Sequence, residues 1–281
     1  MRVPETIRSS AGLCLLSLFL FLFGILFYPR FLTENSRPFA SKAPQPLSIS
    51  SLSNPGKTFR EETSSYSVSW EGYLVAARFT TKAGPIQTPQ GNPRLELILE
   101  ARTVGIVDRY IYKVQDQYRT LADPASMLPL EIFVHTLHGK KETQRHYLLE
   151  PRNRQITLDD GTKRKIPPRT FDLPTLFYFL RRVEWKAGRT EKFSLLERGN
   201  IYEIQCRLEG TESITLNGKS VPTLKISVRI MAEESPDDTY RIRLYLADSP
   251  DRTPLSITAN PSWGQVLVKL EELSSPNPGT P

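Results

Sequence analysis

The chain's three histidines, His135, His138 and His146, lie within twelve residues of one another. Clusters of this kind build metal sites, because imidazole nitrogens are common ligands of zinc. The segment, however, predicts a hairpin that turns near Gly139, and residues three apart on a strand point to opposite faces. Three basic side chains of the same segment would also repel a cation, namely Lys140, Lys141 and Arg145. The pattern therefore favours an exposed polar hairpin, with a metal site at the three histidines as the alternative.

Other reactive side chains predict no catalytic site. The sequence has no nucleophile elbow, no glycine-rich phosphate loop and no Cys-x-x-Cys pair, and it implies no cofactor. The adjacent carboxylates at Asp159–Asp160 and at Asp237–Asp238 both fall in predicted turns, where neighbouring charges are usually solvated. Cys206 occupies an apolar position of an alternating segment, so we expect it to pack as an inert, small hydrophobic residue. An enzyme is therefore the less favoured interpretation.

Aromatic side chains offer a second kind of site. Six of them could line a ligand cavity: Trp70, Tyr73, Phe177, Tyr178, Phe179 and Trp185. The ligand itself cannot be named from these residues, and ordinary core packing is the favoured alternative. Four of the six are the leading cavity candidates: Trp70, Phe177, Tyr178 and Trp185.

The elements that would position these groups are mostly strands, because apolar and polar residues alternate with a period of two. The clearest segments are Tyr66–Trp70, Leu95–Ala101, Tyr202–Leu208, Leu224–Ile230 and Tyr240–Leu244. One apolar face and one polar face are typical of antiparallel strands with a single solvated side. The sequence thus predicts a mainly β fold of curved antiparallel sheets, either half-barrel or sandwich-like.

Turn residues support hairpins between these strands. Asn217–Gly218 is a two-residue hairpin signal, because both positions tolerate positive φ, and Asp160–Gly161 carries the same signal. The phrase LADPASMLPLEI at Leu121–Ile132 also returns as LADSPDRTPLSI at Leu246–Ile257. In each copy we expect a strand to end, Asp to open a turn, and Pro-Leu-x-Ile to start the next strand. The repetition reflects either duplication or convergence on the same turn chemistry.

One segment departs from the period of two and predicts a short apolar helix around residues 173–182. Asp172 can cap this helix, and Pro174 is tolerated in its first turn. Leucines and Phe177 recur at helical spacing on one side, so the helix should dock on the inner face of a sheet.

The N-terminal region predicts attachment to a membrane. Residues 1–10 precede an uncharged apolar run of 18 residues at 11–28, and the basic residues on both sides of this run leave its orientation open. As a helix this run would span roughly 27 Å, close to the ~30 Å of a hydrocarbon core. We favour an uncleaved transmembrane anchor over a cleaved signal. A flexible Pro- and Ser-rich linker at 29–58 then leads to the antiparallel β domain at 59–273 and a disordered tail at 274–281.

The charge distribution excludes one class of partner. The formal net charge is +7, but the charges of both signs are well mixed. A nucleic-acid partner would need a basic stripe with interleaved aromatic residues, and the sequence shows none. Attraction to an anionic membrane surface is the better supported consequence of the positive charge.

Two runs resemble a known family. Tyr66–Gly72 reads YSVSWEG, and Thr170–Arg181 reads TFDLPTLFYFLR. They resemble the Tyr-x-Val-x-Trp-x-Gly opening and the central Asp, apolar stretch and Tyr-x-Leu-Arg run of the bacterial domain-of-unknown-function 3108 family. The resemblance covers roughly Phe59–Leu273. With the run at 11–28 as the anchor, it implies a single-pass protein of the cytoplasmic membrane, with residues 1–10 in the cytoplasm and the β domain in the periplasm or outside the cell. The resemblance brings no established activity and no catalytic residues.

Two hypotheses for function follow. The first is a non-enzymatic binding or scaffold module of the envelope, with a lipid-like ligand or an envelope protein as partner and the membrane contacted through residues 11–28. It predicts a large apolar cavity beside the helix. The second is an envelope hydrolase acting on glycan or peptide, which predicts a polar cleft where at least two carboxyl groups converge.

Overall fold

A computed structural model of the chain describes residues 61–87, 91–232, 235–261 and 264–274. This part of the chain forms one large sheet of 15 strands, in the order β8-β7-β6-β5-β4-β3-β2-β1-β15-β14-β13-β12-β11-β10-β9. The prediction of a mainly β fold is confirmed. The expected anchor at 11–28 and nearly all of the linker and tail lie outside the described residues. Within those residues, no helix has the length and apolar character needed to cross a membrane.

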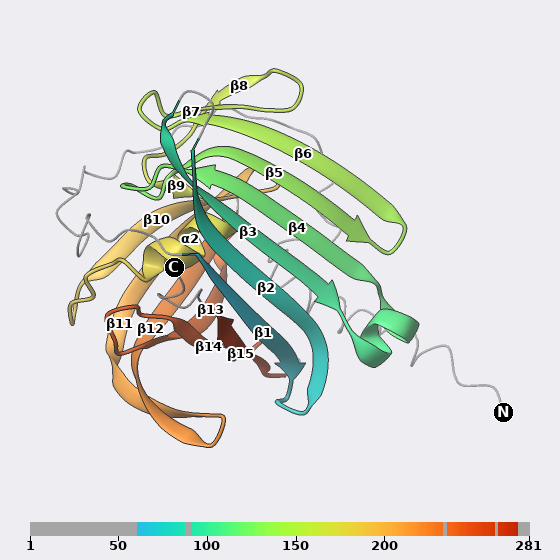
Figure 1. Ribbon diagram of the computed structural model, residues 1–281, viewed down its shortest axis with the longest axis vertical. Helices are drawn as coiled ribbons and strands as arrows, with labels where there is room; N and C mark the ends of the chain where they lie inside the picture. Colours follow the sequence, from blue (N-terminus) through green and yellow to red (C-terminus); the bar gives the residue numbers. More distant parts are fainter. Residues whose placement is uncertain (1–60, 88–90, 233–234, 262–263, 275–281) are drawn as a thin grey trace, which may run out of the picture.

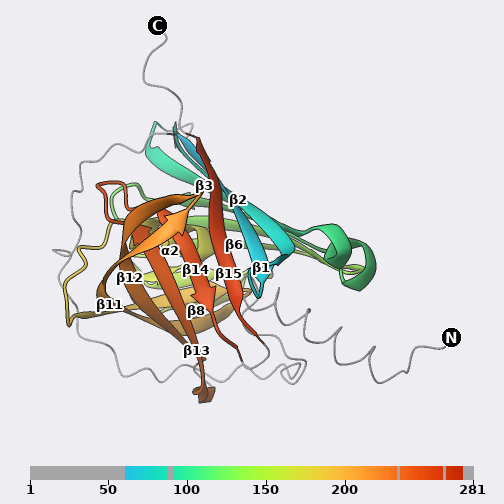
Figure 2. The same cartoon turned by 90° about the horizontal axis from the view of Figure 1, so that it is seen from below.

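The chain starts in the middle of the sheet and fills its two halves in turn. The N-terminal half comprises β1 (Glu62–Trp70), β2 (Leu74–Gln87), β3 (Pro93–Thr103), β4 (Val114–Ala122), β5 (Pro129–His138), β6 (Lys141–Glu150), β7 (Gln155–Thr157) and β8 (Lys163–Lys165). The C-terminal half comprises β9 (Thr170–Phe171), β10 (Thr190–Glu197), β11 (Asn200–Leu216), β12 (Lys219–Ala232), β13 (Ser235–Ala247), β14 (Pro254–Ala259) and β15 (Val266–Ser274). Figure 1 and Figure 2 show the two halves curving toward each other.

The two halves meet along the first and last strands. β1 pairs antiparallel with β2 on one side and with β15 on the other, where Thr63 lies opposite Ser274. From β1 the chain proceeds outward to β8, crosses to β9 at the far edge, and returns strand by strand to β15. Among the described strands only β9 and β10 pair in parallel. This order follows from hairpin connections, which join neighbouring antiparallel strands by short turns.

The expected alternation buries one face of the sheet. In β4, Val114, Asp116, Tyr118 and Thr120 are buried, while the residues between them are exposed. The same pattern holds in β3 and in the first half of β11. Burial on one side only is the behaviour of antiparallel strands with a solvated face, so this prediction is confirmed.

Most of the predicted turns are present. Asn217 and Gly218, with φ of 49° and 76°, form a two-residue turn between paired Leu216 and Lys219. The turn at Asp160–Gly161 is wider than expected, because Thr157 pairs with Lys163 and leaves residues 158–162 as the loop. There the Asp160 side chain accepts a hydrogen bond from the backbone of Thr162, which stabilises an Asx-type turn.

The repeated phrase forms two equivalent hairpins, β4–β5 and β13–β14. In both, the Asp follows the last strand residue, and Pro129 or Pro254 opens the next strand as predicted. Each hairpin also has an irregular register at its closing end, between Leu121 and Ala122 and between Tyr245 and Leu246. Each copy therefore contains a bulge, but at positions one residue apart, because Leu121 aligns with Leu246.

The predicted helix is α2 (Leu173–Leu180), which lies on the concave side of the sheet between the two halves (Figure 1). Asp172 caps it: its carboxylate accepts from the backbone of Thr175, and the Thr175 hydroxyl accepts from the backbone of Asp172 at 3.0 Å. This reciprocal capping box, with Pro174 in the first turn, fixes where the helix begins. α2 ends two residues earlier than predicted, and Arg181 is its C-cap.

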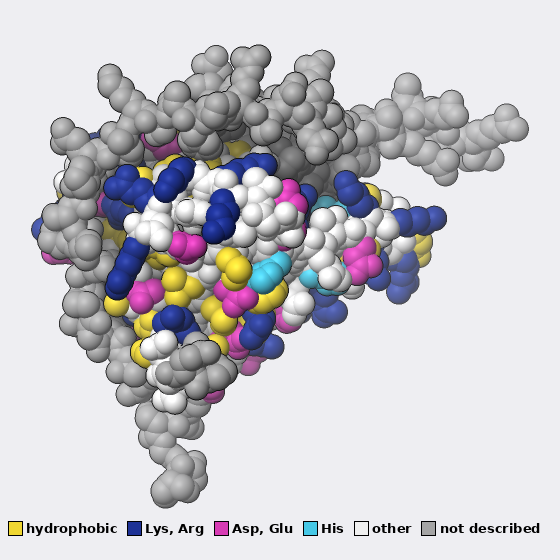
Figure 3. Space-filling model, turned by 90° about the horizontal axis from the view of Figure 1, so that it is seen from above, with side chains coloured by type: hydrophobic (Ala, Val, Ile, Leu, Met, Phe, Trp, Pro, Cys, Tyr) yellow, Lys and Arg dark blue, Asp and Glu magenta, His cyan; other side chains and the backbone are white. Residues whose placement is uncertain are grey.

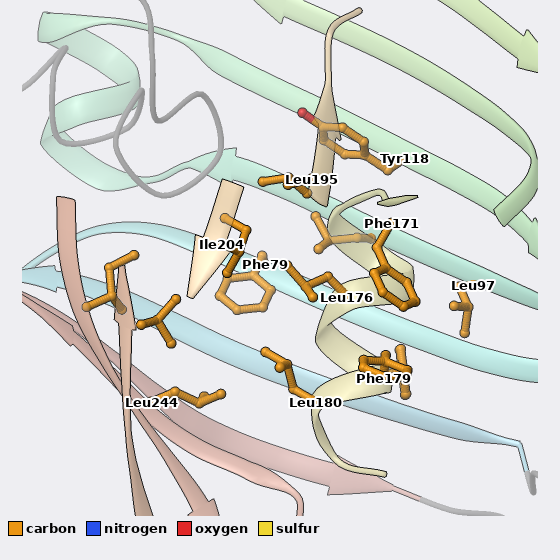
Figure 4. Close-up of a cluster of buried hydrophobic side chains, with 14 of the residues drawn as sticks. Phe79, Leu97, Tyr118, Phe171, Leu176, Phe179, Leu180, Leu195, Ile204 and Leu244 are labelled. Carbon is orange, nitrogen blue, oxygen red and sulfur yellow. The ribbon is translucent and has the colours of Figure 1, made fainter. Parts of the chain in front are cut away.

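Aromatic contacts join α2 to both halves of the sheet. Phe177 meets Tyr66 and Phe79 of the N-terminal half edge-on, with ring centroids 5.8 and 6.5 Å apart. Phe179 stacks on Phe171 and meets Phe193 of β10 at 5.3 Å. Figure 4 shows Phe79, Phe171 and Phe179 among the apolar side chains that the strands contribute around the helix. The helix therefore forms the centre of the core and does not border an empty space there.

Candidate functional site

A buried cluster of polar side chains lies inside the curved sheet. It consists of Asp116, Tyr118, His138, Glu197 and Arg198, and we call it the Asp116–Glu197 cluster. His138 Nε2 lies 2.8 Å from Asp116 Oδ1, and Arg198 Nη2 lies 3.5 Å from Asp116 Oδ2. The Tyr118 hydroxyl donates to Glu197 Oε1 at 2.8 Å, and Arg198 Nε lies 3.3 Å from the same oxygen.

Strand ends and one tight turn bring the cluster together. Asp116 and Tyr118 are on the inward face of β4, and His138 is the last residue of β5. Glu197 ends β10 and pairs with Asn200, so Arg198 occupies a two-residue turn with φ of 50°. β4 and β10 are not neighbours in the sheet. The cluster therefore braces the two halves across the interior.

Burial controls the ionisation of the cluster. Asp116 and Glu197 are each 3% exposed. Loss of water raises the pKa of the Glu197 carboxyl to about 8, despite the opposing effects of Arg198 and the Tyr118 hydrogen bond. Burial also raises the pKa of Tyr118 well above its ordinary value. Burial therefore favours the protonated form of Glu197, which can donate a hydrogen bond as well as accept one.

The cluster contains groups that could transfer protons, but its geometry favours a structural role. Two carboxyl groups, an imidazole and a guanidinium converge, as an acid–base site requires. The side chains of His138 and Arg198, the most accessible members, are only 16% and 14% exposed. Asp116 contacts both His138 and Arg198, so these charged groups stabilise one another inside the fold.

Sequence reasoning missed this cluster. The carboxylate pairs considered from the sequence were Asp159–Asp160 and Asp237–Asp238 in predicted turns. Asp116 and Glu197, which are 81 residues apart, were not among them. The sequence did contain one signal. In the alternating segment Val114–Ala122, Asp116 occupies a position on the inward-facing side, where a charged residue needs a buried partner. The partner itself could not be identified without the topology.

The three histidines are placed on two faces of the β5–β6 hairpin. His135 and His146 lie on the outer face, where they pair with Glu142 at 2.7 Å and with Glu131 at 2.8 Å. His138 points inward to the Asp116–Glu197 cluster. Among the described residues, no three His, Cys, Asp or Glu side chains form a group suited to one metal ion.

The four aromatic cavity candidates do not meet at one place. Phe177 and Tyr178 are adjacent on α2, and the Tyr178 hydroxyl lies 3.2 Å from that of Thr81. The Trp185 indole donates to the carbonyl of Leu180 just beyond the same helix. Trp70 is the last residue of β1. Glu62, at the other end of β1, pairs with Arg181, the C-cap of α2. At 3.3 Å per residue, Trp70 is therefore roughly 26 Å from Glu62 and from the end of the helix. Tyr73 packs near Trp70, with ring centroids 6.4 Å apart.

The aromatic residues of α2 do not line the large apolar cavity that was expected beside the helix. Tyr178 and Phe179 are buried, at 1% and 3% exposed, and Phe177 packs against two other rings. Aromatic side chains are bulky enough to fill the width between helix and sheet. The ligand-binding role of the four candidates remains a prediction.

A small pocket opens instead on the outer face of the C-terminal half. It has a volume of about 180 Å³ and lies where the tip of the β11–β12 hairpin approaches β13, β14 and β15. We call it the hairpin groove. Its lining residues are Ile214, Thr215, Leu216, Tyr245, Ser256, Thr258, Leu267 and Lys269. At roughly 30 Å³ per water-sized group, it holds about six such groups, which is less than a drug-sized ligand requires.

Several solved structures are similar to this chain, and two of them illustrate the likeness. A β-barrel-like protein of domain of unknown function DUF1849 from Brucella abortus matches with a TM-score of 0.50 and 10% identity, over 78% of this chain and 98% of that chain. A DUF1089 family protein from Pseudomonas aeruginosa matches with a TM-score of 0.34 and 13% identity, over 62% of this chain and 87% of that chain. At these identities the first likeness shows the fold alone.

No curated protein matches the chain. A family model does, and its match over residues 65–271 extends from β1 into β15. Both resembling runs, Tyr66–Gly72 and Thr170–Arg181, lie within the matched region. The chain therefore belongs to the DUF3108 family, which is described as "Protein of unknown function (DUF3108)".

Proposed function

We propose that the protein is a membrane-tethered, extracytoplasmic binding module of the bacterial envelope that acts without catalysing a reaction. Support for the tether comes from the uncharged run at 11–28, and support for export comes from the family resemblance. Protease protection in intact spheroplasts tests the orientation. Digestion of the β domain by protease added outside the cytoplasmic membrane is expected, and protection until lysis would exclude this placement.

The hairpin groove is the observation that carries the binding function. Four of its lining side chains are apolar or aromatic: Ile214, Leu216, Tyr245 and Leu267. The hydroxyl of Thr258 and the ammonium of Lys269 add polar groups on β14 and β15, whereas the Ser256 hydroxyl already donates to the carbonyl of Val268 at 2.8 Å. Apolar walls with a few fixed polar groups are typical of ligand sites.

The chemistry of the groove favours the end of an apolar chain that carries an anionic head. A volume of about 180 Å³ accepts only a short segment of a lipid, so the rest of the molecule would extend into solvent or membrane. The positive charge of Lys269 would pair with a carboxylate or phosphate head at the groove. This is a lipid-like ligand, as the sequence suggested, but on the convex face and not beside the helix.

The alternative, an envelope hydrolase acting on glycan or peptide, has one observation in its favour. Asp116 and Glu197 are converging carboxyl groups, and one of them has a raised pKa. Both are nearly inaccessible, so a substrate could reach them only if the halves of the sheet separated. We therefore prefer the binding function.

Native mass spectrometry tests this proposal on the full chain, extracted gently from membranes. We expect an adduct with the mass of an acyl-chain compound. Leu267→Glu places a charge in the groove and should remove the adduct, whereas Leu148→Glu, on an exposed position of β6, should retain it. A wild-type spectrum without adduct, or an adduct that survives Leu267→Glu, would exclude the groove as the site.

A further inference from the structure

Three connections of the N-terminal half gather at one end of its strands. They are the β1–β2 turn, the β3–β4 connection with its π-helical segment η3 (Val107–Ile111), and the β5–β6 turn. The backbone of Val104 donates to Ala76 at 3.0 Å, and Gly139 donates to Lys113 at 2.8 Å. These bonds join the three connections into one continuous rim, which we call the loop end.

Large apolar side chains are exposed at the loop end. Of the six exposed large hydrophobic residues in the described part of the chain, four are here: Tyr73 at 76%, Val75 at 38%, Ile106 at 61% and Tyr110 at 75%. Exposure of one such residue is ordinary, but four on adjoining connections form a group. They project from separate tips and so do not create a pocket for a small molecule.

Basic side chains surround this group. Arg109 lies over the ring of Tyr110, 6.0 Å from its centroid. Lys113, Lys140 and Lys141 are exposed on the same rim. The nearby acids are already engaged: Glu71 accepts from the backbone of Gln265, Asp108 accepts from Thr103, and Glu142 pairs with His135. In Figure 3, Lys and Arg side chains gather at the right-hand end of the molecule, where the β5–β6 turn lies.

We propose that the loop end docks on the surface of an anionic phospholipid bilayer. Tyrosine and isoleucine side chains enter the interface between headgroups and acyl chains, and basic residues around them attract anionic headgroups. Charge complementarity therefore favours a lipid surface over a protein partner.

The chain before β1 is long enough for this orientation. Residues 29–61 lie between the predicted anchor and β1, and such a segment can extend roughly 100 Å at 3.3 Å per residue. β1 itself covers only about 26 Å from Glu62 to Trp70. The loop end can thus face the same membrane that holds the anchor. This second contact is independent of the hairpin groove.

Hydrogen exchange tests the docking. The full chain is reconstituted in nanodiscs of phosphatidylcholine alone and in nanodiscs that also contain phosphatidylglycerol. Amides of residues 104–112 should exchange more slowly in the anionic nanodiscs, with no change in β12 amides. Equal exchange in both lipids, whether slow or fast, overturns the proposal, because docking driven by charge must depend on the lipid.

Variants identify the residues responsible. Replacing Lys140 and Lys141 by Gln should lower the protection of 104–112 about fivefold for each charge removed. The matched control replaces two exposed lysines of β8, Lys163 and Lys165, which are distant from the loop end in Figure 1, and it should leave the protection unchanged.

The apolar contribution is tested with Tyr110→Ser, which alters an exposed side chain and should not affect folding. It should abolish protection in anionic nanodiscs while far-UV circular dichroism stays as in the wild type. Unaltered protection in this variant, or an equal loss in the β8 control, would contradict docking by the loop end.

Discussion

Replacement of Glu197 by Gln is expected to change how stability depends on pH. Glutamine has the shape of the protonated acid, so it can retain the hydrogen bond from Tyr118 without ever carrying a charge. The wild-type carboxyl has its pKa raised by burial to about 8, compared with 4.5 when exposed. Between these two pH values the folded protein binds more protons at this group than the unfolded chain does.

The sign and size of the effect follow from this difference. Because the raised pKa favours the protonated folded state, the free energy of unfolding should fall as the pH rises from 4.5 toward 8. The loss is about 1.4 kcal/mol per pH unit, or roughly 5 kcal/mol over the window. Glu197→Gln removes this contribution, so the stability of the variant relative to the wild type should increase steadily as the pH rises.

The measurement is denaturant unfolding of the detergent-solubilised full chain at pH 5, 6, 7 and 8, followed by tryptophan fluorescence. Glu203→Gln is the control, since Glu203 is exposed on β11 and pairs only with surface partners. The difference between Glu197→Gln and wild type should widen by several kcal/mol across the series. If the difference in the free energy of unfolding between the variant and the wild type changes by less than about 1 kcal/mol from pH 5 to pH 8, Glu197 is ionised in the fold and the reasoning is refuted.

Three further predictions concern the helix and the core. Asp172→Ala removes the cap of α2 and should lower the free energy of unfolding by about 2–4 kcal/mol, while Asp172→Asn should lose less in the same denaturant titration. Arg181→Met leaves Glu62 as a largely buried, unpaired charge and should cost about 3–5 kcal/mol, and Glu62→Leu in the same chain should recover most of it in a double-mutant cycle. Burial raises the pKa of the Cys206 thiol, so maleimide should label it in a Cys14→Ser background only after unfolding, and rapid labelling of the native chain would contradict that burial.

The sequence predicted the local elements well because their causes are local. The alternation in Leu95–Ala101 reports which side chains face the core, and the structure places it in β3 with that face buried. Asp172 and Pro174 mark a helix start through bonds made within one turn. Asn217–Gly218 sets a hairpin because both residues accept positive φ.

What the sequence could not predict depends on which strands become neighbours. Periodicity identifies a buried face but not the strand beside it, so the pairing of β1 with β15 was not foreseen. Asp116 and Glu197 meet only because the C-terminal half returns across the interior. Conversely, Trp70 and Trp185 were equivalent as aromatic candidates. In the structure Trp70 ends β1, whereas Trp185 contacts Leu180 of α2, whose C-cap pairs with Glu62 at the other end of β1.

The pairing of the first strand with the last has a consequence for biogenesis. As the nascent chain emerges, β1 gains β2 at once, but its other edge stays bare until residues 266–274 have been made. Contacts of such large sequence separation form slowly, and an open strand edge invites aggregation meanwhile. A chain truncated before Val266 should therefore accumulate as aggregate or be degraded, even though it retains fourteen of the strands described above.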